Sequence, residues 1–115
     1  MVTAVTSLGR SGLHDWFVQR LSAVVMALYT FFLLWFVATT PNLGYEQWVA
    51  LFHNPVFKIA SILVVILMAF HIWIGLWIIS TDYIKPVAIR MVAQAFTILV
   101  CLSFIFWGIQ ILWSV

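Results

Sequence analysis

Three long stretches without a charged side chain limit what this chain can fold into. They are Leu21–Tyr45, Ile59–Thr81 and Met91–Val115. About 20 residues of helix, rising 1.5 Å each, cross the roughly 30 Å hydrocarbon layer of a membrane. Because lipid cannot satisfy open backbone groups, each such stretch should be helical. The sequence therefore predicts an all-α membrane protein with three transmembrane helices.

The composition excludes the main alternatives to a membrane protein. The 115 residues are 66% hydrophobic and 7% charged, whereas a soluble domain carries about 25% charged residues. There is no basic run that would bind nucleic acid. The apolar run 21–38 exceeds the roughly 7–15 apolar residues of a signal peptide, so we interpret it as a retained helix. Cys101 lies in an apolar run and is interpreted as a small buried side chain.

Helix-breaking residues mark the ends of the spans. Thr39-Thr40-Pro41-Asn42 stops the first helix, Asn54-Pro55 resembles an N-cap with proline at the first helical position, and Lys85-Pro86 separates the last two helices. We expect one membrane-anchor domain over residues 1–115. Its helices should cover about 15–39, 56–82 and 87–114, with a short interfacial segment over about 45–52.

The cations indicate an orientation in the membrane. Arg10, Arg20, Lys85 and Arg90 fall on one side of the predicted spans, and Lys58 alone falls on the other. Cytoplasmic loops carry the excess of positive charge. We therefore predict a cytoplasmic N-terminus and a periplasmic C-terminus.

Small and polar residues form a stripe on the second and third spans. The spacings place each set near one helix face, because 11 residues complete about three turns. Such residues let membrane helices approach closely, so we interpret the stripe of the third span as a packing surface. The members are Ser61, Met68, His71, Gly75 and Asp82 in the second predicted helix, and Gln94, Thr97, Cys101 and Gly108 in the third.

His71 is the candidate for chemistry, because it is residue 13 of the 23 in its span and lies near the bilayer centre. An ionisable residue there is costly and marks a functional site. Its role is either a hydrogen bond between helices or metal ligation. Haem iron suits a lone histidine, since the porphyrin fills four positions, whereas zinc needs three or four protein ligands. Gly75, one turn away, would let a flat macrocycle approach the backbone.

A six-coordinate haem would need a second axial ligand from outside this chain. His14 precedes the first span and His53 follows it, so both lie at the wrong depth. The second ligand would come from a partner subunit or from a second copy of the chain.

Three further residues lie at the predicted cytoplasmic side. Asp82 and Tyr83 follow His71 by about 16 Å along the helix. Tyr83 could donate a hydrogen bond to a quinone carbonyl and Asp82 could relay protons, although tyrosines are also common at membrane interfaces. Arg20 could extend to lipid phosphates or hold an anionic group of a cofactor.

In this order the motifs resemble the small hydrophobic anchor subunits of succinate dehydrogenase, respiratory complex II, of the proteobacterial and mitochondrial type. The resemblance covers essentially the whole chain. It is carried by "LGRSGLHDW" before the first span, "RLSAVVMALY" at its start, and above all His71-x10-Asp82-Tyr83 followed by "IKP".

The resemblance implies roles for individual residues. In this family two different anchor subunits share one haem b, and His71 matches the histidine ligand of the small subunit. Tyr83 matches the tyrosine that hydrogen-bonds a ubiquinone carbonyl, and Asp82 lies where proton delivery is expected. Arg20 corresponds more loosely to a basic residue near the haem propionates. His14 and Asp15 match positions that face the iron–sulfur subunit.

The resemblance also implies partners and a location. A flavoprotein subunit would oxidise succinate, an iron–sulfur subunit would carry the electrons, and the two anchors would bind ubiquinone. This chain alone would not be an enzyme. It would be a multi-pass protein of the bacterial cell inner membrane, with the lipid bilayer and no nucleic acid among its partners.

Three alternatives remain at this point. The chain could anchor a fumarate reductase that works in the opposite direction. It could be a haem-free structural subunit in which His71 only packs. A small multidrug or ion transporter would typically need four spans and a buried carboxylate, which the three charge-free stretches do not provide.

Overall fold

A computed structural model describes residues 12–115, and over this range the chain forms four helices and no strand. The helices are α1 (Gly12–Thr39), α2 (Tyr45–His53), α3 (Pro55–Tyr83) and α4 (Val87–Ser114). Helices α1, α3 and α4 are each long and apolar enough to cross a membrane. The predicted fold, an all-α membrane protein with three spanning helices, is confirmed. Arg10, one of the cations that support the predicted orientation, lies outside the described residues.

Proline and asparagine residues end the helices where the sequence indicates. Helix α1 stops at Thr39, and Asn42 then takes a left-handed backbone conformation with φ of 55°, which asparagine adopts more readily than most residues. Helix α3 ends at Tyr83, and Pro86 forms the N-cap of α4. Because a proline disfavours helix in the residue before it, α3 and α4 remain separate helices.

Asn54 joins α2 to α3 and caps both helices. Its Oδ1 accepts hydrogen bonds from the backbone N–H groups of Val56 (2.9 Å) and Phe57 (3.3 Å). Pro55 opens α3 without needing a backbone donor. The backbone N–H of Asn54 also donates to the carbonyl of Leu51, which closes α2. One asparagine therefore fixes the sharp turn between the two helices.

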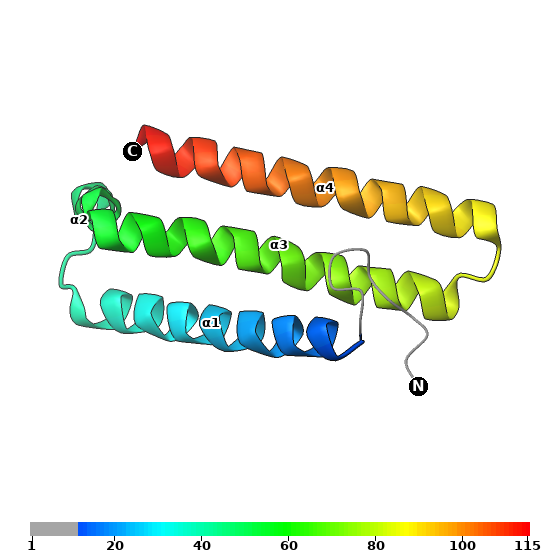
Figure 1. Cartoon of the computed structure of the whole chain (residues 1–115). Coiled ribbons are helices and arrows are strands. Elements are labelled where there is room, and N and C mark those ends of the chain that lie inside the picture. The colour runs from blue at the N-terminus through cyan, green and yellow to red at the C-terminus, as the bar shows by residue number, and fades with distance from the viewer. Residues whose placement is uncertain (1–11) are drawn as a thin grey trace.

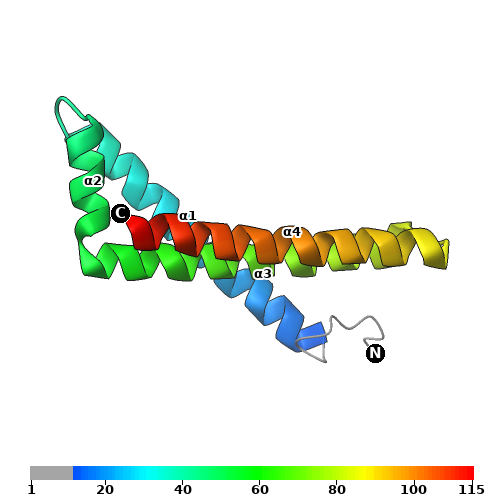
Figure 2. The same ribbon diagram turned by 90° about the horizontal axis from the view of Figure 1, so that it is seen from above.

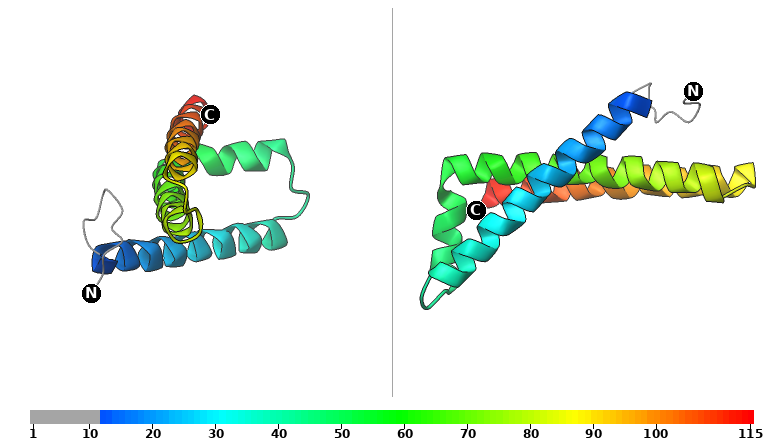
Figure 3. Two further views of the ribbon diagram at one scale, coloured as in Figure 1. Left: turned by 90° about the vertical axis from the view of Figure 1, so that its right-hand side faces the viewer. Right: turned by 90° about the horizontal axis from the view of Figure 1, so that it is seen from below.

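Helix α3 lies between α1 and α4 and contacts each of the other helices (Figure 1). Helix α4 runs antiparallel along the whole of α3, whereas α1 crosses α3 obliquely (Figure 2). Helix α2 lies crosswise at the end where α4 finishes (Figure 3). The start of α1 and the turn between α3 and α4 lie at the opposite end (Figure 1).

Small residues bring α3 and α4 together. Cys101, buried, lies with its Sγ 3.6 Å from the carbonyl oxygen of Ala69, to which it can donate a weak hydrogen bond. Gly108 faces Val65 so closely that a Cβ on the glycine would lie 2.9 Å from a Val65 methyl carbon. The stripe predicted on the third span is therefore a packing surface, as expected. Membrane helices pack closely where such small residues meet.

Helices α1 and α3 meet through aromatic rings and hydroxyl groups near the end that α2 covers. The Tyr29 hydroxyl lies 2.6 Å from the Ser61 Oγ. The Tyr29 ring stacks on Phe57 with 5.5 Å between centroids, and Phe32 lies 5.4 Å from the same ring. In lipid these hydroxyls have no water to bind, so each satisfies the other.

The contact at Gly108 gives a test of this packing. Gly108→Ala should destabilise the chain by about 1–3 kcal/mol, because the β-branched Val65 cannot move aside without shifting a helix. The measurement is an SDS titration of the purified chain followed by circular dichroism. Val65→Ala should restore part of the loss in the double variant, and an equal loss with or without Val65→Ala would contradict the contact.

Candidate functional site

His71 lies in the middle of α3, half-buried, on the face that meets α1. Two residues of α1 contact it, Gln19 and Ser22, which are three positions apart and therefore share a helix face. Ser22 is completely buried, with 0% of its surface exposed. The oblique crossing of α1 over α3 brings these polar side chains together inside an apolar part of the fold.

The hydrogen bonds of Ser22 couple its hydroxyl proton to the position of the proton on the His71 ring. The Ser22 Oγ lies 2.9 Å from the His71 Nδ1 and 3.0 Å from the backbone oxygen of Gln19. A serine hydroxyl has one proton, and the carbonyl of Gln19 can only accept. When the hydroxyl donates to that carbonyl, it must accept from Nδ1. The neutral ring is then protonated on Nδ1 and has a lone pair on Nε2.

The Nε2 atom of His71 is available to a group outside this chain. It makes no hydrogen bond within residues 12–115. The buried side-chain atoms that lack a hydrogen-bond partner in this part of the chain are Gln19 Oε1 and Trp73 Nε1. The His71 Nε2 is not one of them, because it is not fully buried. Metal-binding histidines commonly donate one ring N–H to the protein and use the other nitrogen as ligand.

The surroundings of His71 suit a metal that brings its own ligands. No group of three or more histidine, cysteine, aspartate or glutamate residues forms a metal site within the described range. A zinc ion held by protein ligands alone therefore has no site there. A haem iron needs only an axial ligand from the protein, and the Nε2 of His71 fits that requirement.

Gly75 lies beside Gln19 of α1. A Cβ on Gly75 would lie 3.5 Å from the Nε2 of Gln19, an ordinary van der Waals distance. A side chain of α1 therefore borders this glycine, and the approach of a flat macrocycle at Gly75 stays a prediction.

Arg20 and Asp82 line one groove between the start of α1 and the end of α3. The groove has a volume of about 310 Å³ and also includes Gln19 and the buried Asp15. Arg20 is exposed, and its guanidinium carbon lies 5.7 Å from the centroid of the Trp16 ring, a cation–π distance. The structure therefore brings these two predicted residues together on the side of His71 that leads to the helix ends.

Tyr83 stands apart from that groove. It is the last residue of α3, with 78% of its surface exposed, and makes no hydrogen bond within residues 12–115. The Tyr83 hydroxyl is therefore held by no hydrogen bond in this part of the chain and can bind a group from outside.

His14 and Asp15 lie at the start of α1. The His14 Nδ1 is 4.0 Å from the Asp15 carboxylate.

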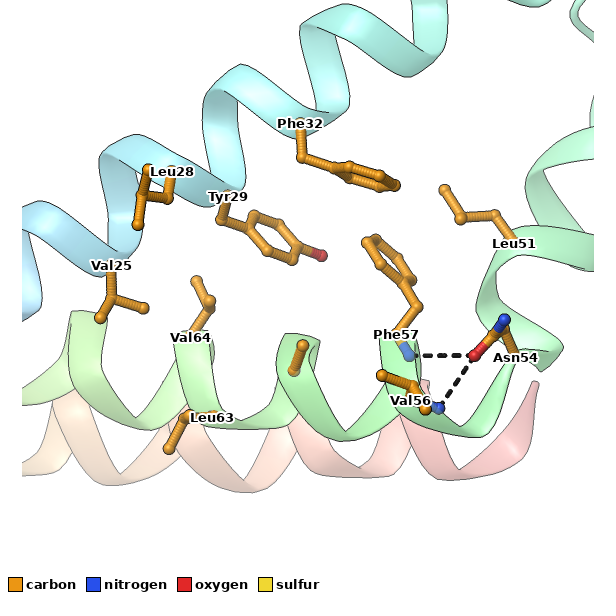
Figure 4. A pocket seen from close by; sticks show the side chains of 11 residues that line it. Val25, Leu28, Tyr29, Phe32, Leu51, Asn54, Val56, Phe57, Leu63 and Val64 are labelled. Carbon is orange, nitrogen blue, oxygen red and sulfur yellow. Dashed lines mark hydrogen bonds between the residues drawn. The ribbon is translucent and has the colours of Figure 1, made fainter.

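A further pocket lies away from all of these residues. It has a volume of about 510 Å³ between α1, α2 and α3 and is lined mainly by apolar side chains, including Phe32 and Leu51 (Figure 4). None of the predicted site residues lines it. Its hydroxyl group, on Tyr29, already bonds Ser61. Besides Tyr29, the polar side chain that lines this pocket is that of Asn54, whose Oδ1 caps α3.

Sequence reasoning missed Gln19 and Ser22. Both lie near the start of the first span. The signal that could have found them is the spacing of Gln19, Ser22 and Tyr29, which fall on one face of a helix. That face is the one that packs on α3.

Comparisons with known proteins agree along nearly the whole chain. The family model described as "Succinate dehydrogenase/Fumarate reductase transmembrane subunit" matches residues 2–110. The succinate dehydrogenase hydrophobic membrane anchor subunit of Coxiella burnetii is 36% identical over 109 residues, which is 95% of each chain. Proteins of the same name from Rickettsia prowazekii and Rickettsia typhi are 28% and 29% identical over 104 residues, or 87% of this chain and 83% of theirs.

Proposed function

Because the chain belongs to the family of succinate dehydrogenase/fumarate reductase transmembrane subunits, we propose that it is the hydrophobic membrane-anchor subunit of a succinate dehydrogenase. The observation that carries the proposal is the 36% identity to the Coxiella burnetii anchor subunit over 95% of both chains. The family description also covers fumarate reductase, but the relatives from Coxiella and Rickettsia bear the succinate dehydrogenase name. The resemblance predicted from the motifs is confirmed, and a transporter is excluded.

The proposal includes a haem b shared with a second anchor subunit. His71 would supply one axial ligand through Nε2, and the partner anchor would supply the other. Support comes from the depth of His71 in α3, the hydrogen bond of Nδ1 to Ser22, and the accessible Nε2. Arg20, exposed in the neighbouring groove, would bind the propionates. A bound haem supplies a one-electron redox centre.

The proposal places ubiquinone at the end of α3. The exposed Tyr83 hydroxyl would donate a hydrogen bond to a quinone carbonyl, and the nearby Asp82 would pass protons toward it. Oxidation of succinate to fumarate releases two electrons and two protons. Reduction of the quinone to quinol consumes two of each, so the two half-reactions balance. This chain would bind and orient the quinone and deliver protons, while its partners would supply the electrons.

The remaining parts of the proposal concern partners and orientation. The catalytic partners would be a flavoprotein and an iron–sulfur subunit, docked at the end where α1 begins and where His14 and Asp15 lie. This end would face the cytoplasm, because Lys85 lies in the turn between α3 and α4 and Arg90 lies just after it. Lys58 would lie on the periplasmic side. Bacterial relatives support a location in a cell inner membrane.

The haem ligand is tested by His71→Leu in the assembled complex. We expect loss of the b-type signal in a dithionite-reduced minus oxidised spectrum, because the variant has no side-chain nitrogen for iron. The matched control is His53→Leu, an exposed histidine at the end of α2, which should leave the spectrum unchanged. An unchanged b-type signal in His71→Leu would refute the ligand, and a wild-type complex without haem would favour a haem-free structural subunit.

The quinone site is tested by Tyr83→Phe. Loss of one hydrogen bond to the carbonyl should lower kcat/KM for quinone reduction about 10-fold, equivalent to about 1.4 kcal/mol, while the haem spectrum stays intact. Tyr45→Phe is the control, since that tyrosine is 81% exposed and lies at the other end of the bundle. Equal kinetics in wild type and Tyr83→Phe would show that the site lies elsewhere.

The orientation is tested by single cysteines in a Cys101→Ala background. A cysteine in place of Lys85 should react with a membrane-impermeant maleimide in inverted inner-membrane vesicles and not in spheroplasts. A cysteine in place of Glu46, in the first turn of α2, should show the opposite pattern. The reverse result for both positions would invert the predicted topology.

A further inference from the structure

We propose that Ser22 is a positioning residue for the haem ligand: it holds the His71 ring in one orientation and keeps the proton on Nδ1, so that Nε2 presents its lone pair. The inference rests on the proposed role of His71 as an axial ligand. In this proposal Ser22 does not touch the haem and affects it only through His71.

The burial of Ser22 shows that its hydroxyl serves an internal contact. The side chain has no exposed surface, and it lies where α1 packs against α3 within the apolar span. A buried hydroxyl in lipid must find its partners inside the protein. Its partners are the Nδ1 of His71 and the carbonyl of Gln19.

The direction of these two bonds selects the ring tautomer. With the hydroxyl proton on the carbonyl of Gln19, the Ser22 oxygen accepts from Nδ1–H of His71. In the opposite arrangement the hydroxyl would give up the carbonyl and donate to Nδ1. The neutral ring would then be protonated on Nε2, which could no longer bind a metal. The bond from Ser22 to Gln19 within α1 therefore favours the ligating form.

Gln19 makes a second hydrogen bond to His71. Its side-chain Nε2 donates to the backbone carbonyl of His71 at 3.3 Å. Two residues of α1, three positions apart, thus contact the ring and the backbone of His71. The contact of Ser22 fixes the rotation of the His71 ring, and the hydrogen bond of Gln19 fixes the position of α3 along α1.

The contact has a measurable consequence for a bound iron. A hydrogen bond from Nδ1–H to an acceptor increases the electron donation of Nε2. Without the acceptor the ring can rotate and change tautomer, and it donates less charge, which disfavours the ferric form. Loss of such a partner typically lowers metal affinity about 10–100-fold.

The experiment compares Ser22→Ala, Ser22→Thr and Ser61→Ala in the complete complex. Ser61 is an equally suitable buried serine, because it also bonds across α1 and α3, to Tyr29, and does not contact His71. The readouts are haem content per complex by pyridine haemochrome and the haem midpoint potential by redox titration. We expect Ser22→Ala to lower haem retention and raise the potential. Ser22→Thr, which keeps the hydroxyl, and Ser61→Ala should both match wild type.

A second measurement does not depend on haem or on assembly. Nitrogen NMR of the full chain in micelles, with ¹⁵N-labelled histidine, reports which ring nitrogen carries the proton, and a His71→Leu sample assigns the signals. We expect a single Nδ1–H form in wild type and a mixture of tautomers in Ser22→Ala. This spectrum remains decisive if the Ser22→Ala complex fails to assemble.

The outcomes separate this inference from the proposed function. A Ser22→Ala complex with wild-type haem content and potential, or a chain with an unchanged tautomer, would overturn the role of Ser22 while leaving His71 as the ligand. A haem signal that survives in His71→Leu would instead overturn the proposed ligand itself.

Discussion

The absence of water from the hydrocarbon layer is the constraint on which this structure depends. A polar side chain within the spans must find a partner in the protein, and the interhelical contacts follow from this requirement. Ser61 meets Tyr29, and His71 meets Ser22. Because each pair joins α1 to α3, the same bonds that satisfy the polar groups also fix how α1 crosses its neighbour.

Helix α3 has two faces with different contacts, one toward α4 and one toward α1. The side toward α4 is a close-packed surface of small residues, with Ala69 against Cys101 and Val65 against Gly108. The side toward α1 carries His71 and leads to the groove that Asp82 lines. Helix α4 packs along the helix that carries His71. The oblique α1 supplies the polar contacts that orient the histidine.

The site is incomplete in this chain alone, which agrees with an anchor subunit. As the proposed ligand, His71 would offer one nitrogen to a haem iron that has two axial positions, and the exposed Tyr83 has no hydrogen-bond partner within residues 12–115. Many large apolar side chains are exposed on all three spanning helices, as expected of surfaces that lipid and partner helices cover. Haem ligation and quinone binding would both require those partners, and one helix would carry both at separate depths.

The sequence alone determined the three spans, their ends and the depth of His71, because charge-free length, prolines and helix periodicity are local properties. It also indicated the family through the ordered motifs. It did not reveal Gln19 and Ser22 as partners of His71, or that Gln19 occupies the space beside Gly75. Those contacts join residues about 50 positions apart, and they depend on where α1 crosses α3. Only the tertiary structure fixes that crossing, because the residues along one helix do not reveal which residues of another helix they meet.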